Sequence, residues 1–386
     1  MKSHIKFSIL ICISAIILSG CAQKEVSFKV DETKMFSAKD TKSTELIREI
    51  AVNKNKKEMA IIQKNGDVWT VTELIEGQNP KTSEEYAEIG EMSYGNDKLV
   101  FSAKKKDGKW TVIEDFFEEG GEYENIKNLI VDDKDKVYFV GEKGGMSFVV
   151  VNYKEIESDK EVLGFALSDT YDLYCVYATY ENGNWFLKDN IGYKSEAFSY
   201  VTTPRQFENG KWAAIVREKD KNKWDVVING EKEPINQDIK EVSYFTLNNK
   251  GELSFVFMKA NEKWVLIYPS KERSQEYNAV MEPIFHPDGE VVYIVESRYS
   301  GKGVEVRKGR KEIVLAENLD STKNLNIIGG NISYITKVKG KWDLYIGNKL
   351  VGSYNNVSNI NVVDNKLIFG AEDINRGIFY EEVTLN

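Results

Sequence analysis

The fold is decided by residues 279–315, which read AVMEPIFHPDGEVVYIVESRYSGKGVEVRKGRKEIVL. Strands are expected at four short apolar segments: 279–285, 290–296, 304–307 and 312–315. The first two segments are separated by the turn sequence His286-Pro287-Asp288-Gly289, and glycine-containing loops separate the others. Short apolar runs between such turn residues are typical of antiparallel strands. The stretch therefore predicts one four-stranded antiparallel unit.

The same unit recurs from residue 46 to the end of the chain. Its landmark is a large apolar residue on the third strand, and nine such anchors occur: Trp69, Trp110, Phe148, Trp185, Trp224, Trp264, Val304, Trp342 and Ile378. Successive anchors are about 36 to 41 residues apart, a period that indicates a β-propeller when every element is a short strand. A solenoid is the alternative, but solenoids usually repeat in fewer residues and do not place four turns in each period.

Three segments resemble a known repeat family. Residues 285–293 (FHPDGEVVY) are similar to the Pro-Asp-Gly repeat of TolB-type, WD-like bacterial propellers. Residues 108–113 (GKWTVI) and 340–345 (GKWDLY) are similar to the third-strand motif of that family. The resemblance covers nearly all of residues 46–386 and implies a propeller. The family includes cell-envelope interaction proteins and non-catalytic propellers of prolyl peptidases, so the resemblance implies no activity.

The expected fold is a single all-β propeller of eight or nine four-stranded blades. Nine repeat units can be counted, although propellers usually have four to eight blades. The last unit, at about 357–385, lacks a fourth strand, and the alternating segment Val26 to Val30 can supply it. Pairing of the N- and C-terminal strands would close the ring and cover the sheet edges that favour aggregation.

The N-terminus has the parts of a bacterial lipoprotein signal. Lys2 and Lys6 precede an apolar stretch at 7–18, which is too short to span a bilayer. The following Leu-Ser-Gly-Cys at 18–21 resembles a lipobox, which implies cleavage after residue 20 and a diacylglycerol on the Cys21 sulfur, with a further N-linked acyl chain such as palmitate. The alternative is an ordinary secreted protein. Two or three acyl chains give a durable membrane anchor.

These features divide the chain into three parts. Residues 1–20 are expected to be a signal peptide, 21–45 the lipidated Cys21 with a polar tether and a possible closing strand, and 46–386 the propeller. The expected location is extracytoplasmic, with the chain anchored to a bacterial membrane of the cell envelope. The formal net charge is −9, and loss of the two signal lysines makes it more negative. An acidic domain is a poor nucleic-acid binder and suits a globule held off anionic lipid by a tether.

Cysteine and histidine are scarce. Beyond Cys21 the only cysteine is Cys175, which lies in an alternating apolar segment and is expected to be a buried small hydrophobe. The only histidine outside the signal is His286, expected to face solvent in its turn. One histidine cannot form a multi-histidine metal site, and most hydrolase triads would depend on it.

No motif for catalysis or cofactor binding was found. Gly-x-Ser-x-Gly, a phosphate loop and a dinucleotide fingerprint are missing from the sequence. Acidic clusters at 118–124 and 132–135 lack the spacing of a calcium loop and are explained as solvated turns. The tryptophans are expected to be core between blades rather than a sugar-binding platform, with Trp212 packing locally on a second strand. We therefore expect no catalytic residue, metal or cofactor. The sequence contains many carboxylates, however, and does not exclude a glycosidase-type pair of them in the central channel.

The loops between second and third strands suggest a partner. They all emerge on one face of a propeller, and three of them are lysine-rich: 104–109, 217–223 and 337–341. A locally basic face on an acidic protein could meet an acidic partner, whereas ordinary charged turn decoration is the simpler interpretation.

The expected function is non-catalytic binding, as a scaffold or receptor for an envelope protein or peptide. The alternative is an envelope propeller that binds carbohydrate or cleaves polysaccharide with channel carboxylates. A third possibility is a mainly structural surface protein. Propellers offer a broad rigid face, and their functions lie in loops whose targets are not encoded in the repeat.

Overall fold

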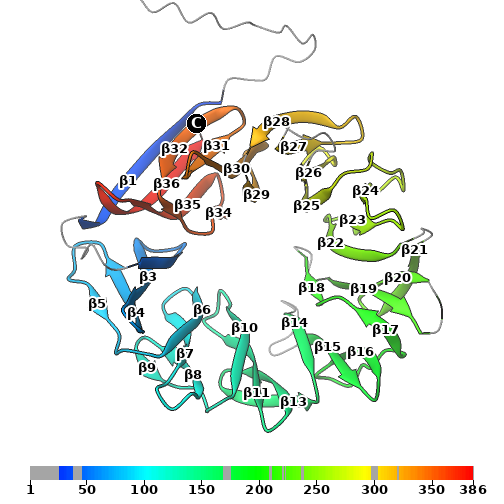
Figure 1. Ribbon diagram of the computed structural model, residues 1–386, viewed down its shortest axis with the longest axis horizontal. Coiled ribbons are helices and arrows are strands. Elements are labelled where there is room, and N and C mark those ends of the chain that lie inside the picture. Colours follow the sequence, from blue (N-terminus) through cyan, green and yellow to red (C-terminus); the bar gives the residue numbers. More distant parts are fainter. Residues whose placement is uncertain are drawn as a thin grey trace, which may run out of the picture.

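The computed structural model describes residues 26–37, 46–167, 175–207, 211–219, 221, 223–235, 239–296, 303–319 and 321–385. Within these ranges the chain forms strands and turns and contains no helix; accordingly, none of the described residues belongs to a helix that could cross a membrane. Small sheets follow one another around a common axis and form a ring (Figure 1). The expected all-β propeller is confirmed.

Each repeat unit contributes short antiparallel strands. The first three units contain β2 (Leu46–Val52), β3 (Glu58–Asn65), β4 (Val68–Ile75), β5 (Lys81–Thr82), β6 (Glu88–Tyr94), β7 (Leu99–Lys104), β8 (Trp110–Glu114), β9 (Phe117–Glu118), β10 (Asn125–Val131), β11 (Val137–Lys143), β12 (Met146–Val151) and β13 (Lys154–Asp159). The next three contain β14 (Val162–Leu167), β15 (Cys175–Glu181), β16 (Asn184–Asp189), β17 (Phe198–Val201), β18 (Arg205–Gln206), β19 (Trp212–Glu218), β20 (Trp224–Ile228), β21 (Glu231–Ile235), β22 (Glu241–Leu247), β23 (Leu253–Met258) and β24 (Trp264–Ile267). The last three contain β25 (Ala279–Phe285), β26 (Val291–Glu296), β27 (Val304–Lys308), β28 (Ile313–Leu319), β29 (Thr322–Ile328), β30 (Asn331–Val338), β31 (Lys341–Ile346), β32 (Lys349–Tyr354), β33 (Asn356–Val357), β34 (Asn361–Val363), β35 (Lys366–Asp373) and β36 (Gly377–Leu385), with β1 (Phe28–Ser37) added to the ninth.

The nine units form eight hydrogen-bonded sheets in the described part of the chain. One sheet has eight strands because units four and five share it. The shared strand is β17, in which Phe198 pairs with Trp185 of unit four and with Glu218 of unit five. The count of nine repeat units is therefore consistent with eight sheets, and two of the blades are merged.

All nine predicted anchors lie on the third strand of their unit. For example, Trp110 begins β8, Trp224 begins β20 and Ile378 is the second residue of β36. The period found in the sequence is therefore the period of the fold. Trp212 begins the second strand β19, as expected, and lies in the apolar cluster between units four and five.

The alternation of strand direction gives the ring two different faces. We call the face with the connections from second to third strands the loop face; connections from one unit to the next also lie there. The opposite face carries the turns from first to second and from third to fourth strands, and we call it the turn face. This arrangement follows because neighbouring strands within a unit are antiparallel.

The N-terminal strand closes the ring. Strand β1 pairs with β36 from Phe28 opposite Leu385 to Ser37 opposite Gly377, which confirms the predicted terminal pairing. The strand is longer than the alternating segment that suggested it and ends at Ser37. Side chains of the first and last units, including Met59 and Ile378, then share one buried apolar cluster.

The blades pack face to face through apolar side chains. Between units five and six the buried cluster includes Ile215, Trp224, Val242 and Phe257. Aromatic rings often meet edge to face, as Tyr123 and Phe139 do with ring centroids 5.5 Å apart. These contacts place the core between neighbouring sheets and confirm that the tryptophans belong to it.

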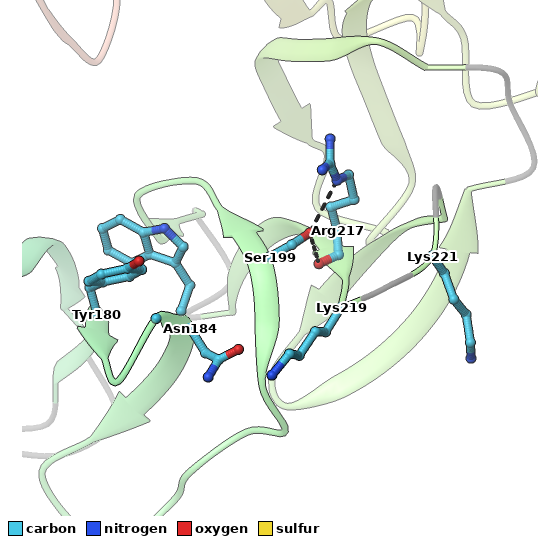
Figure 2. A pocket seen from close by; sticks show the side chains of 8 residues that line it. Tyr180, Asn184, Ser199, Arg217, Lys219 and Lys221 are labelled. Atoms are coloured by element: carbon cyan, nitrogen blue, oxygen red, sulfur yellow. Dashed lines mark hydrogen bonds between the residues drawn. The ribbon is translucent and has the colours of Figure 1, made fainter.

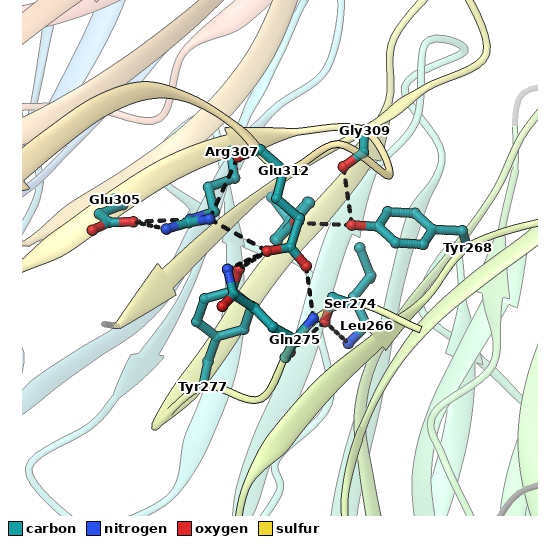
Figure 3. A network of polar contacts seen from close by, with 10 residues as sticks. Leu266, Tyr268, Ser274, Gln275, Tyr277, Glu305, Arg307, Gly309 and Glu312 are labelled. Atoms are coloured by element: carbon teal, nitrogen blue, oxygen red, sulfur yellow. Dashed lines mark hydrogen bonds and ion pairs between the residues drawn. The ribbon is translucent and has the colours of Figure 1, made fainter. Parts of the chain in front are cut away.

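Polar groups also join neighbouring units, as between units six and seven (Figure 3). Glu312 accepts hydrogen bonds from the Tyr277 hydroxyl at 2.7 Å and from the Gln275 backbone at 2.6 Å. Arg307 lies between Glu312 and the buried Glu305, whose Oε2 is 2.6 Å from an Arg307 terminal nitrogen. Because each buried charge has an opposite partner, this network is a structural junction between two blades.

Candidate functional site

A groove of about 530 Å³ opens on the loop face between units four and five. It is lined by Tyr180, Gly183, Asn184, Trp185, Ser199, Arg217, Lys219 and Lys221 (Figure 2). The merged sheet explains its position: β17 leaves β16 to join β19, so the loops of the two units stand on either side of one strand. The groove combines a concave shape with both aromatic and cationic side chains.

One wall of the groove is aromatic. Tyr180 and Trp185 face each other across the β15–β16 hairpin, with ring centroids 5.1 Å apart and planes inclined by 53°. The hairpin turns at Asn182 and Gly183, both of which have positive φ, as a tight two-residue turn requires. The half-buried rings therefore sit on a rigid hairpin rather than on a long loop.

The other wall is cationic. The Nε of Arg217 donates to the Ser199 hydroxyl at 3.1 Å, and Ser199 is itself held by the carbonyl oxygen of Glu218 at 3.1 Å. The remaining guanidinium nitrogens of Arg217 have no acceptor among the described residues. Lys219 is exposed and has no ion pair within the described ranges. Within the described ranges, this wall of the groove thus has two positive charges that are not in an ion pair.

Lys221, the third cation, belongs to an ion-pair cluster behind the groove. Its ammonium lies 3.0 Å from Glu218, which also contacts Lys223 at 3.0 Å and Lys232 at 3.1 Å. Hydrogen bonds from these three lysines hold the pKa of Glu218 well below its usual range. Glu218 is therefore a fixed anion that is already compensated, and it does not neutralise Arg217 or Lys219.

Ion pairs in unit two reduce the net positive charge that was expected on the loop face. Lys105 contacts Glu118 at 3.2 Å and Glu122 at 2.6 Å, and Lys106 lies 3.9 Å from Glu85. The acidic cluster at 118–124 thus compensates Lys105, and Glu85 lies near Lys106. Across the described residues no group of three or more His, Cys, Asp or Glu side chains could hold a metal ion. Within the described ranges, loop-face lysines without an ion pair remain in unit five, at Lys219, and in unit eight, at Lys339 and Lys341.

Several cations of the loop face cover the tryptophan anchors. Lys104 lies 5.9 Å from the Trp110 ring centroid, Arg217 lies 5.9 Å from Trp224, and Lys337 lies 5.5 Å from Trp342. A cation over an indole face is attracted by the ring quadrupole, by about 0.5–1 kcal/mol at exposed sites. Lys104 and Lys337 are therefore held on the protein's own rings, and Arg217 also lies over one, at Trp224. No such ring contact involves Lys219 within the described ranges.

Carboxylates near the ring axis have structural roles. The inner strands carry bulges, and polar side chains at the bulges reach the backbone of the next unit. Glu91 accepts the Leu129 N–H, Glu282 accepts the Leu325 N–H at 3.3 Å, and Arg48 donates to the Ile89 carbonyl at 2.6 Å. Burial raises the pKa of Glu282. The repeated bulges were not anticipated from the sequence.

His286 does not face solvent, which corrects the expectation from its turn sequence. Its side chain is 12% exposed, and its Nε2 lies 2.9 Å from the Gly330 carbonyl oxygen of the next unit. Its Nδ1 lies 2.8 Å from Asp288 and 3.0 Å from the Lys308 ammonium. The turn itself forms as expected, with Gly289 at positive φ. The turn sequence could not reveal the neighbouring unit that covers the ring.

The structure describes Cys175 but not Cys21. Cys175 is buried, with 1% of its surface exposed, and burial raises the pKa of its thiol to about 12. The expected small hydrophobe is therefore confirmed. Cys21, the predicted lipidation site, and the signal peptide at 1–20 lie outside the residues that the structure describes.

Comparison with solved structures gives distant likenesses. No protein-family model and no curated protein sequence matches the chain. Among solved structures, the Dos1 propeller is similar over 93% of this chain and 95% of its own, with a TM-score of 0.47 and 10% identity. The BBS1 N-terminal region, solved in complex with ARL6, is similar over 75% of this chain and 88% of its own, with a TM-score of 0.33 and 12% identity.

Proposed function

We propose that this chain is a lipid-anchored, extracytoplasmic binding propeller of a bacterial envelope, and that it holds an acidic segment of a protein partner in the groove on its loop face. The observation that carries the proposal is the pairing of an aromatic wall, Tyr180 and Trp185, with Arg217 and Lys219, two cations that have no ion pair within the described ranges. Aromatic residues and arginine dominate the energetics of protein interfaces. Positive charge on an acidic domain favours a partner that is acidic at the point of contact.

A non-catalytic role agrees with the chemistry of the described residues. The carboxylates of Glu91 and Glu282 near the ring axis accept backbone N–H groups from the next blade. A glycosidase needs two carboxyl groups that are free to act on a substrate. The described side chains that line the groove are cations, an amide, hydroxyls and aromatic rings, and none of these described side chains is a carboxylate. This composition suits binding better than acid–base catalysis.

A glycan is the second candidate ligand, because the Tyr180 and Trp185 rings could also stack on sugar rings. The positive charge beside them would favour an acidic polysaccharide. The protein partner is preferred because tyrosine, tryptophan and arginine, which meet in this groove, are the residues enriched at the energetic centres of protein interfaces. The next experiment distinguishes a protein partner from a glycan.

The groove is tested with the full mature chain and a crosslinked envelope extract. The double variant Arg217→Ala, Lys219→Ala should lose the captured protein, while Lys154→Ala, Lys271→Ala, which removes the same charge from the turn face, should retain it. Capture should also weaken with salt, because exposed charges are screened over about 8 Å at physiological ionic strength. Equal capture by both double variants would show that the groove is not the binding site. Binding to acidic glycans alone on an array would favour the second candidate.

The anchor is tested separately. Wild-type protein should carry the mass of diacylglycerol on the Cys21 sulfur and fractionate with membranes, whereas Cys21→Ala should lose both properties. Two or more acyl chains give stable anchoring, so the wild type should resist extraction by salt. An unmodified Cys21 in the mature protein would contradict the lipid anchor without affecting the test of the groove.

A further inference from the structure

The position of the N-terminal strand limits how the propeller can sit on a membrane. Strand β1 begins at Phe28, opposite Leu385, at the turn-face end of β36. Val26 lies beside the turn from β31 to β32: its carbonyl oxygen accepts a hydrogen bond from the Lys349 ammonium at 3.4 Å. The chain therefore enters the fold at the turn face of units eight and nine.

The reach from the predicted lipid site to this point is short. Residues 21 and 26 are five residues apart, which corresponds to at most about 18 Å of fully extended chain. The blade is taller than this reach: β31 has six residues, about 20 Å of strand, and loops extend beyond both ends. A lipid on Cys21 could consequently not allow the loop face to lie on the bilayer.

The turn face also carries apolar side chains that suit a lipid surface. Third-to-fourth-strand turns in four units present exposed residues: Phe117 (68% exposed), Ile191 (72%), Ile313 (54%) and Leu350 (47%). These units lie at different places around the ring (Figure 1), and all four turns are on the turn face.

Cations accompany the apolar groups near the point of entry. The exposed Lys311 lies two residues before Ile313, and Lys349 immediately precedes Leu350. Lysines beside apolar side chains are typical of surfaces that lie at the interface of a membrane, because the stem stays with lipid and the charge reaches the headgroups.

We infer that the turn face lies against the membrane surface and that the loop face, with its groove, points away from it. The inference rests on the lipid anchor of the proposed function. It replaces the picture of a globule on a long tether, because β1 takes ten residues out of the segment between Cys21 and the first blade. A partner in the groove would then be reached from the side opposite the bilayer.

The test uses the lipidated full mature chain with Cys175→Ala, so that a single added cysteine carries an environment-sensitive fluorophore. Labels are placed at Leu350→Cys and Ile191→Cys on the turn face and at Val338→Cys on the loop face. Leu350 and Val338 belong to the same blade on opposite faces, and Ile191 lies across the ring. The protein is reconstituted on phosphatidylcholine–phosphatidylglycerol vesicles that contain a headgroup-quencher lipid.

Quenching at Leu350 and Ile191 should exceed quenching at Val338 roughly threefold, since the two faces are about 20 Å apart. Strong quenching at Leu350 and Val338 with little at Ile191 would mean that the ring stands on its edge and would overturn the inference. Equal, weak quenching at all three positions would overturn it as well. Intact mass reports lipidation in the same samples: an unlipidated chain refutes the anchor, whereas a lipidated chain with the wrong quenching pattern refutes the orientation alone.

Discussion

Glu381 of β36 lies directly opposite Glu32 of β1, so two carboxyl groups face each other across the strand pair that closes the ring. Glu32 is paired with Arg376, whose terminal nitrogen is 2.6 Å from its Oε2. Glu381 is only 1% exposed, and its Oε2 has no hydrogen-bond partner among the described residues. Burial, reinforced by the charge of Glu32, raises the pKa of Glu381 to about 8. The closing strand is therefore held beside a carboxyl group that is protonated at neutral pH.

This carboxyl group should make stability depend on pH. Glu381 keeps its proton up to about pH 8 in the folded protein, whereas in the unfolded chain it titrates near its ordinary pKa of 4.5. Its contribution to the free energy of unfolding is thus fully present below about pH 4.5 and is lost as pH rises to about 8, by about 1.4 kcal/mol per pH unit. Urea denaturation should show that the free energy of unfolding of Glu381→Gln rises relative to that of the wild type as pH increases.

The matched control is Glu382→Gln, which changes the next residue of β36. Its side chain is 20% exposed and lies 3.4 Å from the Lys366 ammonium. This variant should follow the wild-type pH dependence. If the difference between wild type and Glu381→Gln is the same at about pH 5.5 and pH 8.5, Glu381 does not titrate as the structure indicates.

Deletion of residues 26–37 should open the ring. The deletion removes a strand that pairs with β36 from end to end and leaves an unpaired edge beside the first blade. Unpaired edges promote association between chains, so the expected result is a lower Tm and concentration-dependent aggregation. A deletion of residues 22–25, before the strand, should leave the Tm unchanged. Thermal unfolding followed by circular dichroism and light scattering measures both effects.

The sequence predicted the fold well because one property recurs in every unit. A large apolar residue near the start of the third strand must enter the core between blades. The period is therefore visible even in the units where Phe148 or Val304 occupies the position that tryptophan holds in other units. The terminal pairing was also predictable, because the last unit lacks a strand and Val26 to Val30 alternates. The missing strand left only one place for that segment.

The site was harder to predict because it depends on contacts between units. The lysines of three loops look alike in the sequence, yet Lys105 is neutralised by Glu118, Lys104 covers Trp110, and Lys219 remains available. His286 likewise meets Gly330 across a blade boundary. The groove was missed although one signal was present: Asn182-Gly183 predicts a tight hairpin, which must bring Tyr180 and Trp185 together.

Glu91 should contribute to stability through the backbone of the next blade. Its carboxylate accepts the Leu129 N–H, and Glu91→Ala would leave that buried donor unpaired, at a cost of about 1–3 kcal/mol. Glu91→Gln keeps an amide oxygen in place and should recover most of the loss. Glu88→Ala, an exposed position on the same strand, serves as the control. If Glu91→Ala and Glu88→Ala unfolded at the same denaturant midpoint, the hydrogen bond from the Leu129 N–H to Glu91 would not contribute to stability as expected.

The tryptophan anchors should differ in how strongly they tolerate phenylalanine. Trp224 is 2% exposed, and its indole Nε1 donates to the Ile239 carbonyl at 3.1 Å, whereas Trp342 is half-buried and makes no such bond within the described part of the chain. Trp224→Phe leaves a buried carbonyl without its donor and a small void, so it should cost about 1–3 kcal/mol. Trp342→Phe keeps the aromatic face that Lys337 covers and should cost less than about 1 kcal/mol. Because both residues occupy the same slot of the repeat, chemical denaturation of the two variants compares a buried, hydrogen-bonded indole with a half-buried one, and equal losses would contradict the expected difference.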